Sequence, residues 1–372
     1  MDFIYLDNGA STPLDPVVAQ GLAERQATCF ANPNSVHPLG RAAAQALEEA
    51  RAKLALTVGA APEEVIFTSG GTESLSLALL GDPTPGGRVA ISAVEHASVT
   101  EGARWLAEHR GMQVDEVPVD ALGRVTPAAL ALRLDPETRL VAIMLANNEV
   151  GTLNDMPALA AVVRARAPRA RLVVDAVQAL GKIPLQVKAL GADHVAFAAH
   201  KIHGPKGIGA LWSARPFQPT FKGGGQEGGL RGGTQSVPLA WALAEAAARH
   251  LPDMPRIAAL RDRLWARLQL VPGIALNGPP IGPERLGNNL HVRVPGLASM
   301  AVLEALAERG VCASAGSACG KGRFSRTLGA LGFHPEDGAF IRLTIGRFTT
   351  EAEVEAGADR FIDAVASLRA SL

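Results

Sequence analysis

Short apolar runs alternate with longer helical patterns through the first two thirds of the chain. The runs are rich in Val, Ile and Ala and lie at 65–68, 88–92, 140–145, 171–175, 194–199 and 209–212. Runs that are apolar on both faces are typical of strands buried in a parallel sheet. Helical stretches such as 157–167 separate them. This alternation predicts an α/β domain whose mostly parallel central sheet is flanked by helices.

The pattern changes after Val237. A helix ending at His250 is followed by a longer amphipathic one, and strand-like and helical segments then alternate less regularly. These later elements are expected at 256–271, 288–296, 299–310 and 340–346. They predict a smaller α+β domain. We therefore expect a large domain over residues 16–250, and a small domain formed by residues 1–15 and 251–372.

Charge and apolar run length exclude several classes of partner. The 372 residues include 36 basic and 36 acidic side chains, so the balance favours neither nucleic acid nor an anionic membrane. No apolar run approaches the roughly 20 residues of a membrane helix. The first residues, MDFIYLDNGA, lack the basic region of a secretory signal. Three cysteines, few and odd in number, suit a reducing compartment. We expect a soluble cytoplasmic protein.

One stretch of low complexity, 222–236, reads KGGGQEGGLRGGTQS. Its composition alone favours a flexible linker.

Polar side chains follow five of the predicted strands. In chain order they are Thr72 (after Gly70 and Gly71), His96, Asn147 with Asn148, Asp175 with Gln178, and His200 with Lys201. Ligands of open parallel sheets bind beyond the carboxyl ends of the strands. Taken singly, each residue has an ordinary structural explanation as a helix cap, a turn former or a surface side chain.

Taken together, these side chains match one ligand. A glycine-rich helix start can hold a phosphate, a carboxylate can hold a pyridine nitrogen in its protonated form, and a lysine can form a Schiff base with an aldehyde. The combination predicts pyridoxal 5'-phosphate as the cofactor.

Sequence segments spread along nearly the whole chain carry a family resemblance. They are YLDNGASTP (5–13), ANPNSVH (31–37), TSGGTES (68–74), EHAS (95–98), NNEVG (147–151), DAVQ (175–178), HKIHGPKGIGAL (200–211), RGGT (231–234), SAGSAC (314–319) and IRLTIGRFTT (341–350). The chain resembles cysteine desulfurases of the NifS/IscS-like group, within the class V, fold-type I aminotransferases. The resemblance implies a homodimeric enzyme that converts L-cysteine to L-alanine.

The resemblance also implies roles around the cofactor. Lys201 is similar to the lysine that forms the Schiff base and later moves the substrate α-proton, and His96 to a histidine that stacks on the ring and helps proton transfer. The remaining implied contacts are Asp175 to the ring nitrogen, Gln178 and Asn148 to the phenolic oxygen, Gly71, Thr72 and His200 to the phosphate, and Thr234 to the phosphate in the neighbouring subunit. By the same resemblance, Lys206 is structural.

Substrate and sulfur involve two further residues. Arg342 resembles the arginine that grips the substrate carboxylate, with Asn148 beside it, a task suited to a bidentate guanidinium. Cys319 resembles the cysteine that becomes a persulfide. Lys321 and Arg323 lie close to it in sequence, and nearby cations lower a thiol pKa. A sulfur-acceptor protein is implied, with an iron–sulfur scaffold as one candidate and thiolated RNA or cofactor synthesis as other destinations. Cys29 and Cys312 are interpreted as buried.

One departure and several alternatives stay open at this point. Ala198 stands where the family usually has a serine that binds the phosphate, a loss of about 1–2 kcal/mol if nothing replaces the hydroxyl. The site would look the same in a selenocysteine lyase, and an aminotransferase would not need Cys319. A catalytically weak interaction or carrier member is a third alternative. A metal site built on His194, His200 and His203 is disfavoured because the neighbouring residues do not follow a metal-ligand pattern.

Overall fold

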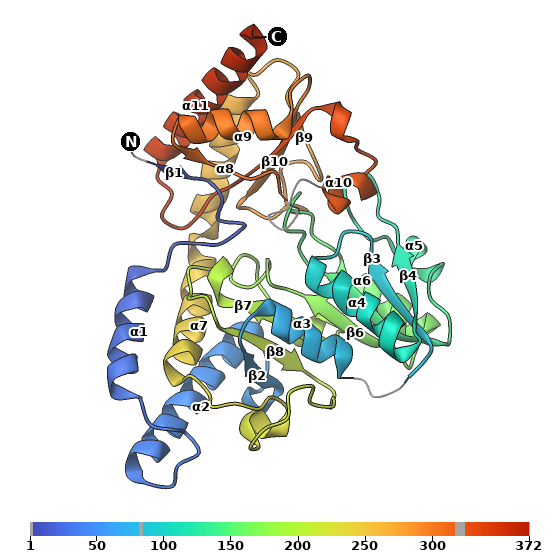
Figure 1. Cartoon of the computed structure of the whole chain (residues 1–372), viewed down its shortest axis with the longest axis vertical. Helices are drawn as coiled ribbons and strands as arrows, with labels where there is room; N and C mark the ends of the chain where they lie inside the picture. Colours follow the sequence, from blue (N-terminus) through green and yellow to red (C-terminus); the bar gives the residue numbers. More distant parts are fainter. Residues whose placement is uncertain (1–2, 82–84, 317–323, 372) are drawn as a thin grey trace.

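The computed structural model describes residues 3–81, 85–316 and 324–371. Figure 1 shows two bodies: a large sheet with its helices in the lower part of the view, and a smaller body in the upper part that holds both ends of the chain. Helices α7 (Val237–His250) and α8 (Met254–Leu268) link the two.

The large body is built on a seven-stranded sheet with the order β2-β8-β7-β6-β5-β3-β4. Its strands are β2 (Val65–Thr68), β3 (Arg88–Ser92), β4 (Gln113–Val117), β5 (Thr138–Met144), β6 (Arg171–Asp175), β7 (His194–Ala198) and β8 (Gly209–Ser213). Strands β3 to β7 run parallel, and β8 is antiparallel to both of its neighbours. The segment 199–208 between β7 and β8 is too short for a crossover, so β8 must return in the opposite direction. The predicted α/β fold with a mostly parallel central sheet is confirmed.

Strand β4 was not predicted. Its sequence, QVDEV, is largely exposed and lies at the edge of the sheet, where polar side chains replace the buried pattern. The hydrophobic pattern therefore identified the inner strands and the buried edge strand β2, and missed the polar edge strand β4.

Helices cover both faces of this sheet. Besides α7 they are α1 (Pro16–Thr28), α2 (Pro38–Val58), α3 (Gly71–Leu80), α4 (Ala97–Arg110), α5 (Pro127–Ala131) and α6 (Met156–Arg166). Short 3-10 turns lie at η1 (Pro62–Glu64), η2 (Val187–Leu190), η3 (Ala199–Lys201) and η4 (Gln226–Gly229). Helix α2 illustrates the local causes: Pro38 opens it, apolar residues recur on one face, and Gly59 closes it in a left-handed conformation with φ of 69°.

Alternate residues of the inner strands bury on opposite faces. Val141 and Ile143 of β5 pack in one core with side chains of α2, α6 and α7, whereas Leu140 and Ala142 pack in another with those of α3 and α4. Because both faces of these strands are buried in apolar cores, polar side chains gather at the strand ends.

The smaller body contains two short sheets and its own helices. Its elements are β1 (Ile4–Tyr5), β9 (Ala275–Leu276), β10 (Asn289–Val294), β11 (Val311–Cys312), β12 (Ala339–Thr344), α9 (Ser299–Glu308), α10 (Arg326–Ala330) and α11 (Glu351–Ala370), with 3-10 turns η5 (Leu251–Asp253) and η6 (Pro335–Asp337). A separate core joins Ile4 and Leu6 to side chains of α8, β10, β12 and α11. These cores support the proposed division into residues 16–250 and residues 1–15 with 251–372, which stays a prediction.

A fourth, small core joins the two bodies. It includes Val94 and Met144 from the large body and Leu328 and Phe340 from the smaller one. Within the described residues, no helix combines the length and the apolar character that a membrane crossing requires.

Candidate active site

One cavity of about 450 Å³ lies where the parallel strands end. The predicted site residues that line it are Gly71, Thr72, His96, Asn148, Asp175, Gln178, His200, Lys201 and Arg342. The cavity therefore brings together side chains from five strand ends of the large body and from β12 of the smaller one.

Two of the predicted site residues, Thr234 and Cys319, are not among the described residues that line this cavity. Thr234 lines a separate pocket of about 160 Å³, together with Ser69 and Arg231, so its role across a dimer stays a prediction. Cys319 lies outside the described residues. Gly316, the last described residue before it, does line the cavity.

Lys201 ends a 3-10 turn that directly follows β7. The turn is tight: the amide of Gly204 donates to the carbonyl of Ala199, and a Cβ at position 204 would lie 2.7 Å from the Ala199 Cβ. Nζ of Lys201 donates to the carbonyl oxygens of Gly9 at 2.9 Å and Ala10 at 2.7 Å. Lys206, in the same loop, is exposed and is not among the residues that line the cavity. The cavity thus includes Lys201 and not Lys206, and the Schiff-base role of Lys201 stays a prediction.

Asp175 is the last residue of β6 and is almost fully buried. Its Oδ1 accepts from the amide of Val177 at 2.9 Å. Burial raises the pKa of its carboxyl, and the nearby charges of His96 and Lys201 oppose that effect. A cationic partner in the cavity, such as a protonated pyridine nitrogen, would compensate the cost of burying this carboxylate.

His96 has two functions at once. It caps α4, because its Nδ1 accepts from the amide of Ser98 at 3.1 Å, and it also lines the cavity. Since Nδ1 is the acceptor, the ring proton lies on Nε2. Burial lowers the pKa of the imidazole, so the ring is neutral near pH 7. The helix-cap interpretation is confirmed, and the role of His96 against the cofactor ring stays a prediction.

The start of α3 has the features of a phosphate site. The first turn of a helix leaves amide groups without partners within the helix. A Cβ at Gly71 would lie only 2.6 Å from Cγ2 of Val177, so glycine is required for this close packing. The Oγ1 of Thr72 is 2.9 Å from Oγ of Ser98. The Cβ of Ala198 lies 3.7 Å from the ideal Cβ position of Gly71, so the missing serine hydroxyl belongs to this end of the cavity.

His200 lies at the same strand end. Its Nδ1 is 3.4 Å from Oγ of Ser11. Burial first, and then the charges of three lysines, lower the pKa of its imidazole to about 4. A neutral ring can donate one hydrogen bond to a ligand without adding charge.

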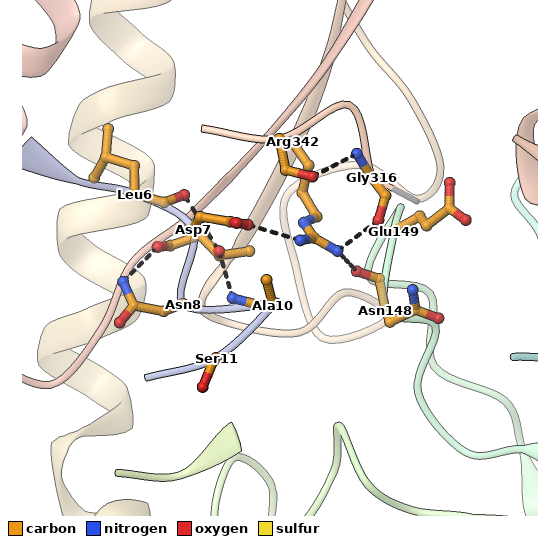
Figure 2. A network of polar contacts seen from close by, with 12 residues as sticks. Leu6, Asp7, Asn8, Ala10, Ser11, Asn148, Glu149, Gly316 and Arg342 are labelled. Atoms are coloured by element: carbon orange, nitrogen blue, oxygen red, sulfur yellow. Dashed lines mark hydrogen bonds and ion pairs between the residues drawn. The ribbon is translucent and has the colours of Figure 1, made fainter. Parts of the chain in front are cut away.

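Arg342 is almost completely buried in β12, and its contacts come from both bodies (Figure 2). Its Nη2 pairs with Oδ1 of Asp7 at 2.7 Å, and its Nη1 donates to the carbonyls of Asn148 and Gly316, each at 2.9 Å. Its Nε is buried and has no partner among the described residues. The backbone of Gly9 packs close to this nitrogen: a Cβ added at Gly9 would lie only 3.2 Å from Nε of Arg342. A carboxylate in the cavity would fit this remaining donor.

Sequence and structure comparisons agree with the geometry. The model of the aminotransferase class-V family matches residues 4–356, which is most of the chain. The chain belongs to this family. Membership confirms the expected cofactor, pyridoxal 5'-phosphate, and the predicted resemblance.

Several class V relatives are similar over nearly their full length. A protein of Trichormus variabilis named cysteine desulfurase 2 is 38% identical, with 95% of this chain and 91% of that protein covered. Cysteine desulfurase IscS 1 of Archaeoglobus fulgidus is 35% identical, with 94% of each covered. Among solved structures, a NifS-like protein superposes with a TM-score of 0.88 at 32% identity, covering 98% of this chain and 99% of that one. The structure of SspA in complex with cysteine gives 0.81 at 28% identity, with 93% and 99% covered.

Two buried carboxyl groups of this class V site were not predicted. Glu95 lines the cavity, and its Oε1 accepts from the amide of Met144 at 2.8 Å and from the hydroxyl of Ser92. Its Oε2 is buried without a partner among the described residues. Burial, aided by the charge of Asp175, raises its pKa from 4.5 to about 8. Its position beside His96 in the EHAS segment was the only sequence signal.

Glu149 is the second of these groups. Its Oε2 accepts from the hydroxyl of Ser325, and burial raises its pKa. It also lines the cavity, and a Cβ at Gly316 would lie 2.9 Å from its Oε2. Glu149 thus contacts described residues on both sides of the segment that carries Cys319.

The glycine-rich stretch is not a free linker, so that expectation from composition is wrong. Glu227 is buried and pairs with two nitrogens of Arg51, at 2.7 and 2.9 Å. Arg231 pairs with Glu73 in the first turn of α3. These charged pairs attach the stretch to α2 and α3.

The other two cysteines are less buried than expected. Cys29 and Cys312 are both only partly buried. Cys29 follows the last turn of α1, and Cys312 lies in β11, whose only strand partner among the described residues is the short β1. Neither position is covered on all sides, which explains why the buried interpretation is wrong.

Proposed function

We propose that this class V protein is a pyridoxal-phosphate-dependent cysteine desulfurase, which converts L-cysteine to L-alanine and transfers the sulfur to Cys319. One observation carries the proposal: Lys201, Asp175 and Arg342 line a single cavity, with a donor of Arg342 left for a ligand. The names of the relatives and the cysteine complex of SspA support the choice of substrate.

The residues around the cavity suit the cofactor. Asp175 would hold the ring nitrogen, Gln178 and Asn148 the phenolic oxygen, and His96 the ring face. Gly71, Thr72 and His200 would hold the phosphate. When bound, the cofactor supplies an aldehyde that captures amines and a ring that withdraws electrons from the α-carbon of the captured amino acid.

Lys201 would bind the cofactor and then act as the general base. Its Nζ donates to two backbone carbonyls at 2.7 to 2.9 Å, and these contacts orient the amine. An unprotonated amine held in this position can take the α-proton and return it later. His96, neutral and with its proton on Nε2, is suited to assist this transfer.

Arg342 would orient the substrate. The contacts with Asp7, Asn148 and Gly316 fix the plane of the guanidinium, and the remaining N–H of Nε would bind the α-carboxylate. Preorganisation of this kind places the substrate sulfur on one side of the cavity and limits the entropy lost during reaction.

Cys319 would act as the nucleophile. Its thiolate attacks the substrate sulfur, the new S–S bond forms, and the C–S bond breaks with its electron pair left on the substrate carbon. That carbon takes up a proton, so alanine leaves and Cys319 retains the sulfur as a persulfide. The persulfide then passes its outer sulfur to a thiol of an acceptor protein.

The assembly and location belong to the same proposal. We propose a cytoplasmic homodimer in which Thr234 reaches the phosphate of the neighbouring subunit, and a sulfur acceptor for which an iron–sulfur scaffold is one candidate. The attachment of the 222–236 stretch through Arg51 and Glu73 supports a fixed surface at Thr234.

Mass spectrometry of the protein after incubation with cysteine tests the proposal. We expect a gain of one sulfur atom on Cys319 and release of alanine, and loss of both in Cys319→Ala. Alanine release that persists in Cys319→Ala would contradict the persulfide step. Faster alanine release from selenocysteine than from cysteine, without sulfur on Cys319, would favour a selenocysteine lyase.

A further inference from the structure

A buried lysine lies directly behind the cavity wall. Lys182 is 3% exposed and is not among the residues that line the cavity. Its Nζ donates to Oε1 of Gln178 at 2.6 Å. Gln178 does line the cavity, and its Nε2 donates to the carbonyl oxygen of Gly9 at 2.9 Å. The amide of Gln178 is therefore held between a donor behind it and an acceptor in front of it.

We propose that Lys182 is a positioning residue that fixes this amide, so that Gln178 presents N–H groups rather than its oxygen to the cavity. The inference rests on the proposed function only in assigning a cofactor oxygen as the acceptor. A protonated lysine has donors and no acceptor, and a backbone carbonyl has only an acceptor. With Lys182 on one side and Gly9 on the other, only one of the two amide orientations makes both hydrogen bonds.

The same contacts extend to the reactive amine. The carbonyl of Gly9 accepts from Gln178 and also from Nζ of Lys201, which donates in addition to Ala10. A continuous series of hydrogen bonds thus joins Lys182 to Lys201. When Lys201 moves to react, Gln178 still has Lys182 to hold its oxygen, so the orientation of the amide does not depend on the position of Lys201.

The charge of Lys182 strengthens the effect. Among the described residues it pairs with no carboxylate, and the titratable groups whose charges act on or respond to it are Lys201, Arg342, His200, His203 and His250. Burial and the charges of Lys201 and Arg342 lower its pKa to about 7. While protonated, Lys182 polarises the amide of Gln178 and makes its N–H groups better donors. Such donors favour an anionic oxygen over a neutral hydroxyl.

The test is the pH dependence of the cofactor absorbance in the resting protein. In Lys182→Met, the amide loses one of the two hydrogen bonds that fix its orientation, so the anionic phenolic oxygen faces a weaker and less fixed donor. We expect the pH midpoint of the absorbance change to rise by about one unit, a roughly tenfold gain in proton affinity. Lys188→Met is the matched control, because Lys188 is an exposed lysine in the next turn that pairs with Glu64. A midpoint in Lys182→Met equal to that of the control would overturn the proposal.

A double-mutant cycle separates orientation from direct charge. If Lys182 acts through Gln178, then Lys182→Met should shift the midpoint little in a Gln178→Ala background. A shift as large as in the wild-type background would mean that the charge acts directly, and the positioning role would be wrong. Lys182→Gln, which keeps a donor for Oε1 without the charge, should shift the midpoint less than Lys182→Met.

Neutron crystallography of the wild-type protein gives a test that needs no substitution. We expect deuterium on the Gln178 nitrogen that faces Gly9, and an amide oxygen facing Lys182. The reverse orientation would overturn the proposal. Failure of the proposed function is distinguishable, because it would appear as absence of alanine release from wild-type protein whatever the orientation of Gln178.

Discussion

The carboxyl end of the large sheet and the N-terminal segment at residues 7–10 contribute to the same site in different ways. The sheet end supplies side chains with chemistry of their own, such as Asp175 and Lys201. The N-terminal segment supplies mainly anchors: the carbonyls of Gly9 and Ala10 for Lys201, and the carboxylate of Asp7 for Arg342. Changes at the sheet end should therefore affect the chemical step, whereas changes in the segment should affect how well the substrate is held.

The largest effect is expected for Lys201→Ala. Removal of the amine eliminates both the covalent link to the cofactor and the general base, so alanine release should fall by at least about 10³-fold. The measurement is the rate of alanine release together with the cofactor absorbance. Lys206→Ala, an exposed lysine in the same loop, should retain most of the activity. Equal losses in both variants would remove the distinction between the two lysines.

A smaller loss of rate is expected for Asp175→Asn. The amide keeps the shape but cannot stabilise a protonated ring nitrogen, so kcat should fall by roughly 10²–10³-fold. Because burial raises the pKa of Asp175, its charged form is unfavourable in the cofactor-free protein. Thermal unfolding of the cofactor-free variant near pH 7 should therefore show a Tm a few degrees higher than the wild type. A lower Tm would mean that the carboxylate is stabilised by contacts other than the cofactor.

Asp7→Ala tests the N-terminal segment. Arg342 would lose its only described carboxylate partner and its fixed orientation, so KM for cysteine should rise by about tenfold while kcat changes less. Steady-state kinetics provide the measurement, with the exposed Asp363→Ala on α11 as the control. A fall in kcat as large as that of Asp175→Asn would break the comparison between the two regions.

The smallest effect is expected in the pH dependence of stability. The folded state raises the pKa of Glu95 to about 8, so between its ordinary 4.5 and about 8 the folded protein holds a proton that the unfolded chain has lost. The stability from this group is complete below the lower value and is lost as the pH rises through the higher one. Glu95→Gln mimics the protonated form. The difference in Tm, variant minus wild type, should therefore grow by a few degrees as the pH rises from about 5 to about 9, because only the wild type loses stability over this range. A constant difference would show that Glu95 does not titrate in this range.

The contrast between the sheet end and the N-terminal segment also explains which features could be predicted from the sequence. Inner strands such as β5 and β6 are continuous apolar runs, and the polar residues after them are adjacent in sequence, so both the sheet and most of the cavity lining were predictable. The edge strand β4 is polar, and β9 has only two residues, so no periodic pattern marks them.

Contacts between distant residues were not predictable in this way. Gly9 and Lys201 are 192 positions apart, and Asp7 and Arg342 are 335 apart. The carbonyl groups of Gly9 and Ala10 leave no residue-type signal at all, because every residue has one. Glu95 was hidden for another reason: an acidic residue before a helix is usually exposed, and only the fold shows that this one is buried.

The pairing of the N-terminal strand has a consequence for synthesis of the protein on the ribosome. Ile4 of β1 aligns with Val311, and the amide of Thr344 donates to the carbonyl of Leu6 at 2.7 Å. Ile4 and Leu6 are synthesised long before Val311 and Thr344, so they must wait for these later residues before the anchors of Lys201 and Arg342 are in place. A nascent chain that stops short of β12 could form the large sheet, but its cofactor pocket would be incomplete. Tight binding of pyridoxal 5'-phosphate should therefore occur late, after synthesis has passed β12.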